Sequence, residues 1–295
     1  TITWNPAGLP GLRRTEFTTT YADLYAMGIT QSYMGFVRPF SDRVALGFDW
    51  SSVGFDDKEL LYTENKLNFA VGIQPHRMFS FGFTLKYLMR DMQLDGTSYG
   101  KSSGLGYDAG LLIQPLKNLK LGLGLYDLGG TSVSYKDKTT ETILGQAFKL
   151  GISYMPINGL TLAADFGDRY HFGAEYILAS RISFRAGMQQ DYSGDEKILV
   201  PSAGLSIKFR SIIMEYGYES HPYLEPTHRI SLALQFSPAV VSITTTLVAH
   251  NPIFRSLHRY YEAEPFVKVG LKNISDADLP VDVSLFVPTM MDNPH

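Results

Sequence analysis

The side chains of this 295-residue chain that could do chemistry include seven histidines. An esterase or phospholipase needs a Ser, a His and an orienting acid or amide in contact. Only His171 and His228 fall in strand-like segments, on opposite faces, and no G-x-S-x-G motif occurs. The absence of cysteine excludes thiol catalysis, disulfides and zinc–thiolate sites. We therefore predict no enzymatic activity and no catalytic residue, and expect His171 in a polar network.

Carboxylates are the second group that could do chemistry, because clustered Asp and Glu side chains bind calcium. The acids within strand-like segments are spread along the chain and show no ligand spacing. The pairs Asp56–Asp57 and Asp195–Glu196 lie in expected loops, where they suit either weak calcium binding or simple solvation. The sequence predicts neither a metal site nor a cofactor. A net charge of −3 and a pI near 6.2 indicate no nucleic-acid partner.

The segments that carry these side chains alternate in polarity with a period of two. In residues 79–90, FSFGFTLKYLMR, every second residue from Phe79 to Met89 is apolar, and most residues between them are small, polar or charged. Successive side chains of a strand point to opposite faces. At about 3.3 Å per residue the segment spans about 40 Å, which suits a strand tilted across a bilayer. No apolar run reaches the roughly 18 residues of a membrane-spanning helix.

The same alternation recurs and predicts fourteen strands, two less regular ones at 15–25 and 31–38 and twelve clean ones. The apolar face of the clean strands carries no Lys, Arg, Asp or Glu. Bacterial outer-membrane barrels have an even number of antiparallel strands. We therefore predict an all-β fold, a 14-stranded antiparallel transmembrane β-barrel over residues 15–236. The clean segments are 43–51, 66–74, 79–90, 107–114, 119–126, 148–154, 160–166, 170–176, 181–188, 202–209, 212–218 and 229–236.

The links between the segments alternate in length. Tight links, four of them with proline, follow the even-numbered strands, whereas longer links occur at 52–65, 91–106, 127–146 and 189–198. Outer-membrane barrels place short turns in the periplasm and long loops outside. Both ends of the barrel are then expected on the periplasmic side, and Phe236 is expected to be the terminal aromatic residue of the strand that closes it.

The polar face of the strands mixes Gly and Ser with charges of both signs, which is typical of a crowded barrel interior. The structural interpretation is a lumenal network of ion pairs that props and fills the barrel, because buried charges must pair. The functional alternative is a pore or cavity that favours anions, because the cations outnumber the acids. We favour the network. Its predicted members are Asp49, Lys66, Lys86, Arg90, Asp108, Lys149, Asp165, His171, Glu175, Arg181, Arg185, Lys208, Glu215 and Arg229.

Residues 237–295 change character and contain three short strand-like runs, at 240–250, 265–275 and 280–288. The runs resemble the opening strands of an immunoglobulin-like sandwich, which needs about seven strands. Three strands alone make a thin core. We therefore expect a partial immunoglobulin-like β segment in the periplasm, either the start of a longer region or a piece that packs under the barrel mouth.

Several motifs follow one another in an order that a known group shares. A tyrosine-rich hairpin at 21–25, Gly-Phe-Asp-Trp at 47–50 and Tyr-Thr-Glu-Asn-Lys-Leu at 62–67 follow an NPAGL box. In these features and the strand number, residues 3–236 resemble the PorV/PorQ group of FadL-like outer-membrane proteins. The resemblance implies that residues 1–14 are the remnant of a hatch, which lies in the lumen or at the periplasmic mouth. The box consists of Asn5, Pro6, Ala7, Gly8 and Leu9.

The resemblance to PorV implies an anchor or adaptor for a type IX secretion or surface-attached complex. Its periplasmic or secreted protein partner would bind residues 237–295 and the long outer loops. FadL itself moves long-chain fatty acids, so the alternative is a channel for hydrophobic or anionic small molecules. A structural subunit of a larger surface assembly is the third hypothesis. All three place the barrel in the lipid of a bacterial outer membrane.

Overall fold

The computed structural model describes residues 2–57, 60–95, 97–135, 140–191, 198–236, 241–247 and 267–273. The chain divides into two compact units, Thr1–Phe236 and Ser237–His295. The described part of the first unit is a β-barrel, and that of the second is one two-stranded sheet. Among the described residues, no helix has the length and apolar character to cross a membrane.

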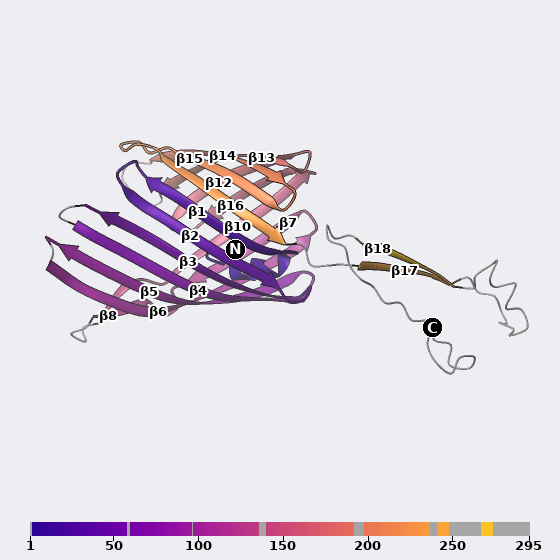
Figure 1. The fold of residues 1–295 in the computed structure, drawn as a ribbon, viewed down its shortest axis with the longest axis horizontal. Coiled ribbons are helices and arrows are strands. Elements are labelled where there is room, and N and C mark those ends of the chain that lie inside the picture. Colours follow the sequence, from indigo (N-terminus) through magenta and orange to yellow (C-terminus); the bar gives the residue numbers. More distant parts are fainter. Residues whose placement is uncertain are drawn as a thin grey trace, which may run out of the picture. The chain divides into compact units, whose positions relative to one another are not determined.

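Within the described part of the first unit, fourteen antiparallel strands close into a barrel (Figure 1). The ring runs from β1 to β7 and on from β10 to β16, which pairs back with β1. This confirms the predicted 14-stranded antiparallel barrel. The wall strands are β1 (Thr15–Leu24), β2 (Ile29–Pro39), β3 (Val44–Asp56), β4 (Leu60–His76), β5 (Phe79–Leu94), β6 (Thr97–Leu116), β7 (Leu119–Tyr126), β10 (Ala147–Ile157), β11 (Leu160–Phe166), β12 (Arg169–Leu178), β13 (Ile182–Asp191), β14 (Leu199–Phe209), β15 (Ile212–Glu219) and β16 (Thr227–Phe236).

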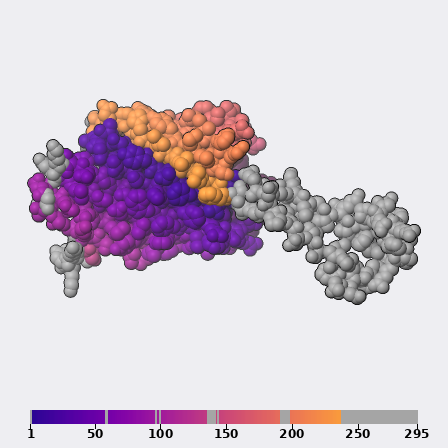
Figure 2. All heavy atoms as spheres, in the orientation of Figure 1, coloured from indigo at the N-terminus to yellow at the C-terminus, as the bar shows by residue number. Residues whose placement is uncertain are grey.

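The seam of the barrel joins the first wall strand to the last. Thr15, which begins β1, is the register partner of Phe236, which ends β16. Figure 2 shows the same junction, with the N-terminal strands in indigo lying against the C-terminal ones in orange. The first wall strand therefore begins, and the last one finishes, on the side of the barrel that carries the short turns.

Four wall strands extend past their predicted ends. β3, β4, β5 and β6 have 13, 17, 16 and 20 residues, and pairing continues out to Asp56–Leu61 and Leu94–Thr97. The links predicted at 52–65 and 91–106 are therefore mostly strand, and that part of the prediction is wrong. Alternation marks a strand only where one face is apolar and the other polar. Beyond the apolar belt both faces meet polar surroundings, so the pattern fades although the backbone pairing continues.

The link predicted at 127–146 contains a hairpin, which corrects the expectation of a plain loop. β8 (Thr131–Tyr135) pairs with β9 (Thr140–Leu144) and also with residues 102–105 of β6. Gly129 and Gly130 precede β8 with φ of +78° and +80°, a conformation that glycine adopts without strain. Each strand has only five residues, too few for an alternating pattern to stand out.

Side chains that point away from the lumen form an apolar belt. On β4, Phe69 is 55 % exposed whereas its neighbour Asn68 is 2 % exposed. On β5 the same contrast separates Phe81, 51 % exposed, from Ser80, 3 % exposed. Water-soluble proteins rarely expose apolar surface of this extent, whereas membrane barrels present such a belt to lipid. The alternation in the sequence therefore divides the wall into a lipid-facing and a lumenal set.

The second unit is described in two strands. β17 (Val241–Leu247) and β18 (Val267–Asn273) form an antiparallel pair and fall within the first two predicted runs. The third run, at 280–288, lies outside the described residues, so the immunoglobulin-like interpretation stays a prediction.

The N-terminal segment lies inside the barrel, where the 3₁₀-helix η1 (Pro6–Gly11) contacts β2 to β6. Asn5 caps the helix by accepting a hydrogen bond from the Ala7 N–H at 3.0 Å. Its amide nitrogen also donates to the carbonyls of Leu111 and Leu123 at 3.3 and 3.4 Å. Asn5 therefore ties the helix start to β6 and β7.

Apolar packing and lumenal glycines hold the segment in place. Ile2 and Leu9 pack in one buried cluster with Val37, Ala45 and Ala70 of the wall. A Cβ atom added at Gly82 would overlap the backbone of Pro6 and Ala7. Added Cβ atoms would likewise overlap segment atoms at Gly47, Gly72 and Gly110. These glycines let the backbone of the segment approach the wall closely.

Replacing Gly82 with Ala is expected to destabilise the barrel by overpacking, at about 1–3 kcal/mol. The control Gly173→Ala also adds a lumenal methyl group, but its Cβ would lie 3.7 Å from the Ala186 oxygen, an ordinary contact. The measurement is the unfolding midpoint of both variants in detergent, by the heat-dependent mobility shift of folded barrels on gels.

A second comparison shows whether the N-terminal segment causes the loss. In a chain that lacks residues 1–12, Gly82→Ala is expected to have no further effect, because its clash partner is gone. An equal loss of stability in chains with and without residues 1–12 would contradict the close contact between the N-terminal segment and Gly82.

Candidate functional site

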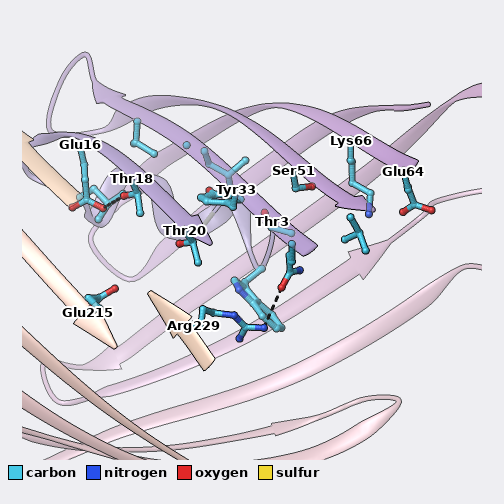
Figure 3. Close-up of a pocket in the computed structure, with 17 residues that line it drawn as sticks. Thr3, Glu16, Thr18, Thr20, Tyr33, Ser51, Glu64, Lys66, Glu215 and Arg229 are labelled. Atoms are coloured by element: carbon cyan, nitrogen blue, oxygen red, sulfur yellow. Dashed lines mark hydrogen bonds between the residues drawn. The ribbon is translucent and has the colours of Figure 1, made fainter. Parts of the chain in front are cut away.

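The largest described cavity lies in the barrel lumen and measures about 630 Å³ (Figure 3). Ile2, Thr3, Trp4 and Leu12 of the N-terminal segment form one side of it. The wall contributes polar and charged side chains from six strands. These are Glu16, Thr18 and Thr20 of β1, Gln31 and Tyr33 of β2, Ser51 of β3, Glu64 and Lys66 of β4, Glu215 of β15 and Arg229 of β16.

Two of the acids at this cavity are held in ion pairs. The Glu64 carboxylate accepts a hydrogen bond from the Arg90 Nε at 2.7 Å. Glu215 accepts one from the Arg185 Nη1 at 2.8 Å, and the same guanidinium donates to Glu175, also at 2.8 Å. The charge of Glu64 is thus compensated by Arg90, whereas Glu175 and Glu215 share the single positive charge of Arg185.

The cations at the cavity lack such partners. Neither Lys66 nor Arg229 forms an ion pair with any carboxylate in the described part of the chain. Arg229 instead donates to the amide oxygen of Gln31 at 3.1 Å, the contact dashed in Figure 3. Glu16 accepts from Gln235 at 2.8 Å and from Thr18 at 3.2 Å. The cavity therefore presents two cations and one acid outside ion pairs.

A separate buried cluster lies where β5 and β6 meet the turn between β7 and β8. The Lys86 ammonium lies 2.7 Å from Asp108 and 2.6 Å from Asp127, and all three side chains are at most 12 % exposed. Asp127 also accepts from the Thr131 hydroxyl at 2.5 Å, and its N–H donates to Asp108. One lysine thus neutralises part of two buried carboxylates and fixes the chain that leads into β8.

The N-terminal segment is tied to the lumen by polar contacts as well. The Thr3 hydroxyl donates to Asp49 at 3.1 Å, and the Asn68 amide donates to the same carboxylate at 2.6 Å. The Tyr126 hydroxyl donates to the Trp4 carbonyl. The Lys149 ammonium lies 5.7 Å from the centre of the Trp4 indole, within the range of a cation–π contact.

Lys149 also reaches the short link between β11 and β12, where it pairs with Asp168 at 2.9 Å. This hydrogen bond holds the pKa of the Asp168 carboxyl below its ordinary value. Asp165 and His171, on the adjacent β11 and β12, line two smaller cavities beside Trp4. In the described chain, no three His, Asp or Glu side chains gather so that they could hold a metal ion.

The predicted lumenal set is divided into several local groups instead of forming one continuous network. Lys208 donates to Gln235 at 2.8 Å, apart from the other predicted cations. Arg181 lies next to the turn that precedes β13, where its carbonyl accepts from the Lys208 N–H. Sequence reasoning missed Asp127 and Asp168 because they lie in links, where strand alternation gives no signal. It also missed Trp4 and Glu64, although Glu64 is part of the motif at 62–67.

No protein-family model matches the sequence, and no curated protein matches it significantly. Solved structures do match the fold. The monoaromatic hydrocarbon channel CymD superposes with a TM-score of 0.61 at 14 % identity, over 80 % of this chain and 92 % of its own. The Ralstonia pickettii toluene transporter TbuX gives 0.58 at 12 % identity, over 80 % and 93 %. A Pseudomonas aeruginosa FadL homologue gives 0.55 at 12 % identity, over 79 % and 92 %.

These similarities define the class of fold. The chain has the fold of FadL-type outer-membrane β-barrels, as the NPAGL box and the strand number predicted. The apolar belt on its outer face fits that class. Nothing in the comparisons supports the narrower PorV/PorQ assignment, which stays a prediction.

Replacing Lys86 with Met should destabilise the barrel by about 3–5 kcal/mol, because Asp108 and Asp127 would stay buried without their shared cation. The matched control is Lys101→Met. Lys101 pairs with Asp91 at 2.8 Å but is 61 % exposed, so its loss should cost about 1 kcal/mol or less. Unfolding midpoints in detergent measure both losses. Equal losses in the two variants would contradict the claim that the buried Lys86 stabilises the barrel more than the exposed Lys101 does.

Proposed function

We propose that this protein is an outer-membrane channel for small organic molecules that combine an apolar part with an acidic group. The observation that supports this most is the cavity of about 630 Å³ inside the barrel, bordered by the N-terminal segment and by two cations that pair with no carboxylate among the described residues. Its ligand-binding residues would be Lys66 and Arg229 for the acidic group, with the Trp4 and Tyr33 rings beside the apolar part. No catalytic step belongs to this proposal.

The preference for an anion follows from the charges that remain after pairing. Glu64 is paired with Arg90, and Glu215 shares Arg185 with Glu175. Lys66 and Arg229 have their charges available, and Glu16 is the one lining acid outside an ion pair in the described chain. A ligand acid that reaches either cation gains a charge-assisted hydrogen bond, which is about twice as strong as a neutral one.

The chemistry of this lining differs from that of a hydrocarbon site. The similar structures CymD and TbuX are titled as a monoaromatic hydrocarbon channel and a toluene transporter. A hydrocarbon in this cavity would displace water from charged side chains without replacing their hydrogen bonds, which is costly. An aromatic acid avoids that cost, because its carboxylate meets the cations and its ring meets Trp4 or Tyr33. The fold thus supports a channel, and the side chains that line the cavity support an organic acid as its ligand.

Binding of benzoate, toluene and benzylamine to the detergent-purified barrel tests the proposal. We expect benzoate to bind most tightly, and Lys66→Gln and Arg229→Gln each to weaken it about 10- to 100-fold, the range for losing a hydrogen bond to a charged group. Lys101→Gln is the control, because Lys101 does not line this cavity. Calorimetric titration gives the affinities, and equal binding of benzoate and benzylamine would contradict the anion preference.

A second role, partner binding through residues 237–295, rests on the compact unit that follows the barrel. Its described part is the two-stranded sheet of β17 and β18, and a strand edge can pair with an added strand of another protein. We propose that this segment lies in the periplasm and binds a protein there, as an anchor or adaptor would require.

Removal of residues 237–295 should abolish co-purification of a specific partner from native membranes while the barrel still folds. The comparison is between full-length and truncated chains under the same mild detergent, with bound proteins identified by mass spectrometry. If the full-length barrel purifies alone, or if the truncated chain retains the same partner, the adaptor role is wrong.

A further inference from the structure

The N-terminal segment occupies one side of the lumen. Its helix η1 contacts β2 to β6, and the inward-facing side chains there are nearly inaccessible to solvent. Asp49 and Thr84 have no exposed surface and Asp108 only 4 %. The segment therefore packs closely over these positions of β3, β5 and β6, whereas the cavity of about 630 Å³ remains beside β1 to β4.

The inward-facing side chains of the opposite wall have a different environment. Ala163 and Asp165 of β11 and Arg185 of β13 point to the lumenal side of their strands, yet each is exposed. Glycines stand at neighbouring inward positions, Gly151 on β10 and Gly173 on β12, which are register partners of Asp165 and Ala163. Small side chains leave space along this wall, and that space is accessible to water.

Two cavities occupy this space. One of about 290 Å³ is lined by Lys120 and Ser153, a register pair close to the short turns. The other, of about 350 Å³, reaches Gln189 and Glu219 near the opposite ends of β13 and β15. The two share Trp4, Ala163, Asp165 and His171 in their linings. Together they follow the wall from the short-turn end toward the other end.

Trp4 stands at the junction of all three lumenal cavities. Its side chain is 67 % exposed although it lies inside the barrel. The hydrogen bond from Tyr126 to its carbonyl and the Lys149 ammonium over its ring hold it there. The indole is therefore the largest side chain that projects from the N-terminal segment into the open side of the lumen.

From these observations we propose a second activity, conduction of small hydrated ions along the wall formed by β7 and β10 to β14, past the N-terminal segment, with Trp4 at the constriction. The charged lining of the two cavities is mixed. Lys120, Lys149 and Arg229 face Asp165 and Glu219, and Lys149 is paired with Asp168. Because the remaining charges balance, the passage discriminates little between small cations and anions. This activity goes beyond the organic-acid site, with which the passage shares Trp4 and Arg229.

Single-channel recording in planar bilayers with potassium chloride tests the passage on the full chain. The unmodified protein is expected to give discrete conductance steps with similar permeability for K⁺ and Cl⁻. Ala163→Trp should abolish most of the conductance, because an indole would fill the shared part of the two cavities. Trp4→Ala should raise the step size by widening the constriction.

The matched control is Ala164→Trp, one residue further along β11. Ala164 faces the opposite side of the strand, between Ile152 and Phe172 in the register, so an indole there meets lipid and should leave the conductance unchanged. Folding of each variant is checked by its heat-dependent gel mobility, and a variant that does not fold is replaced by the smaller Ala163→Leu.

Absence of conductance from folded, inserted protein would overturn the passage, as would equal conductance in the Ala163 and Ala164 variants. Benzoate binding is measured on the same preparations. A barrel that binds benzoate but does not conduct refutes the passage alone. A barrel that conducts but does not bind benzoate refutes the organic-acid site alone, so the two failures are distinguishable.

Discussion

Backbone hydrogen bonding in lipid is the constraint on which this structure depends. The hydrocarbon core of a membrane offers no water to an unpaired N–H or C=O group, so a sheet can cross it only if it closes on itself. Here β16 pairs with β1 over nine register positions, from Thr15–Phe236 to Asp23–His228, and β5 pairs with β6 along their length. Closure removes both edges of the sheet and thereby forces alternate side chains either outward to lipid or inward to the lumen.

The inward set then has to fill a wide barrel without leaving isolated charges. The structure does this unevenly. One half of the wall receives the N-terminal segment, whose backbone approaches the lumenal glycines Gly72 and Gly82 and whose Thr3 hydrogen-bonds Asp49. The other half keeps space around Trp4, bordered by small residues such as Gly151 and by charged ones. The lumen is therefore packed where η1 meets the wall, and cavities remain beside β1 to β4 and along β10 to β14.

Much of the fold could be predicted because lipid imposes the period-two alternation on every wall strand. All fourteen wall strands and the lipid-facing rings, such as Phe69 and Phe81, follow from that pattern. The extensions of β3 to β6 could not be predicted, because they lie where neither face is constrained to be apolar. The hairpin of β8 and β9 escaped detection for the same reason, and because the turn that leads into it is held by contacts of Asp127 with Lys86 and Asp108, which no local pattern indicates.

Less of the candidate site than of the barrel wall could be predicted from the sequence. Alternation identifies which charges point inward, but not which of them meet. Lys86 pairs with Asp127 from a link, and Arg185 bridges Glu175 and Glu215 from two other strands. These partners depend on the register between strands and on links outside the alternating segments. Among the described residues, seven of the fourteen predicted members form ion pairs, and the choice between a structural network and an anion-favouring cavity stays a prediction.

The most direct test of the account is a cysteine and spin-label scan through residues 79–90 of β5, which the cysteine-free chain permits without background. Power-saturation EPR in bilayers would measure the access of each label to oxygen, which concentrates in lipid, and to a water-soluble nickel chelate. We expect oxygen access to peak at every second residue, at Phe81, Phe83 and Leu85, with the residues between them shielded from lipid. Uniform access along the strand, or greater oxygen access at Gly82, Thr84 and Lys86, would contradict a closed barrel with an apolar outer face.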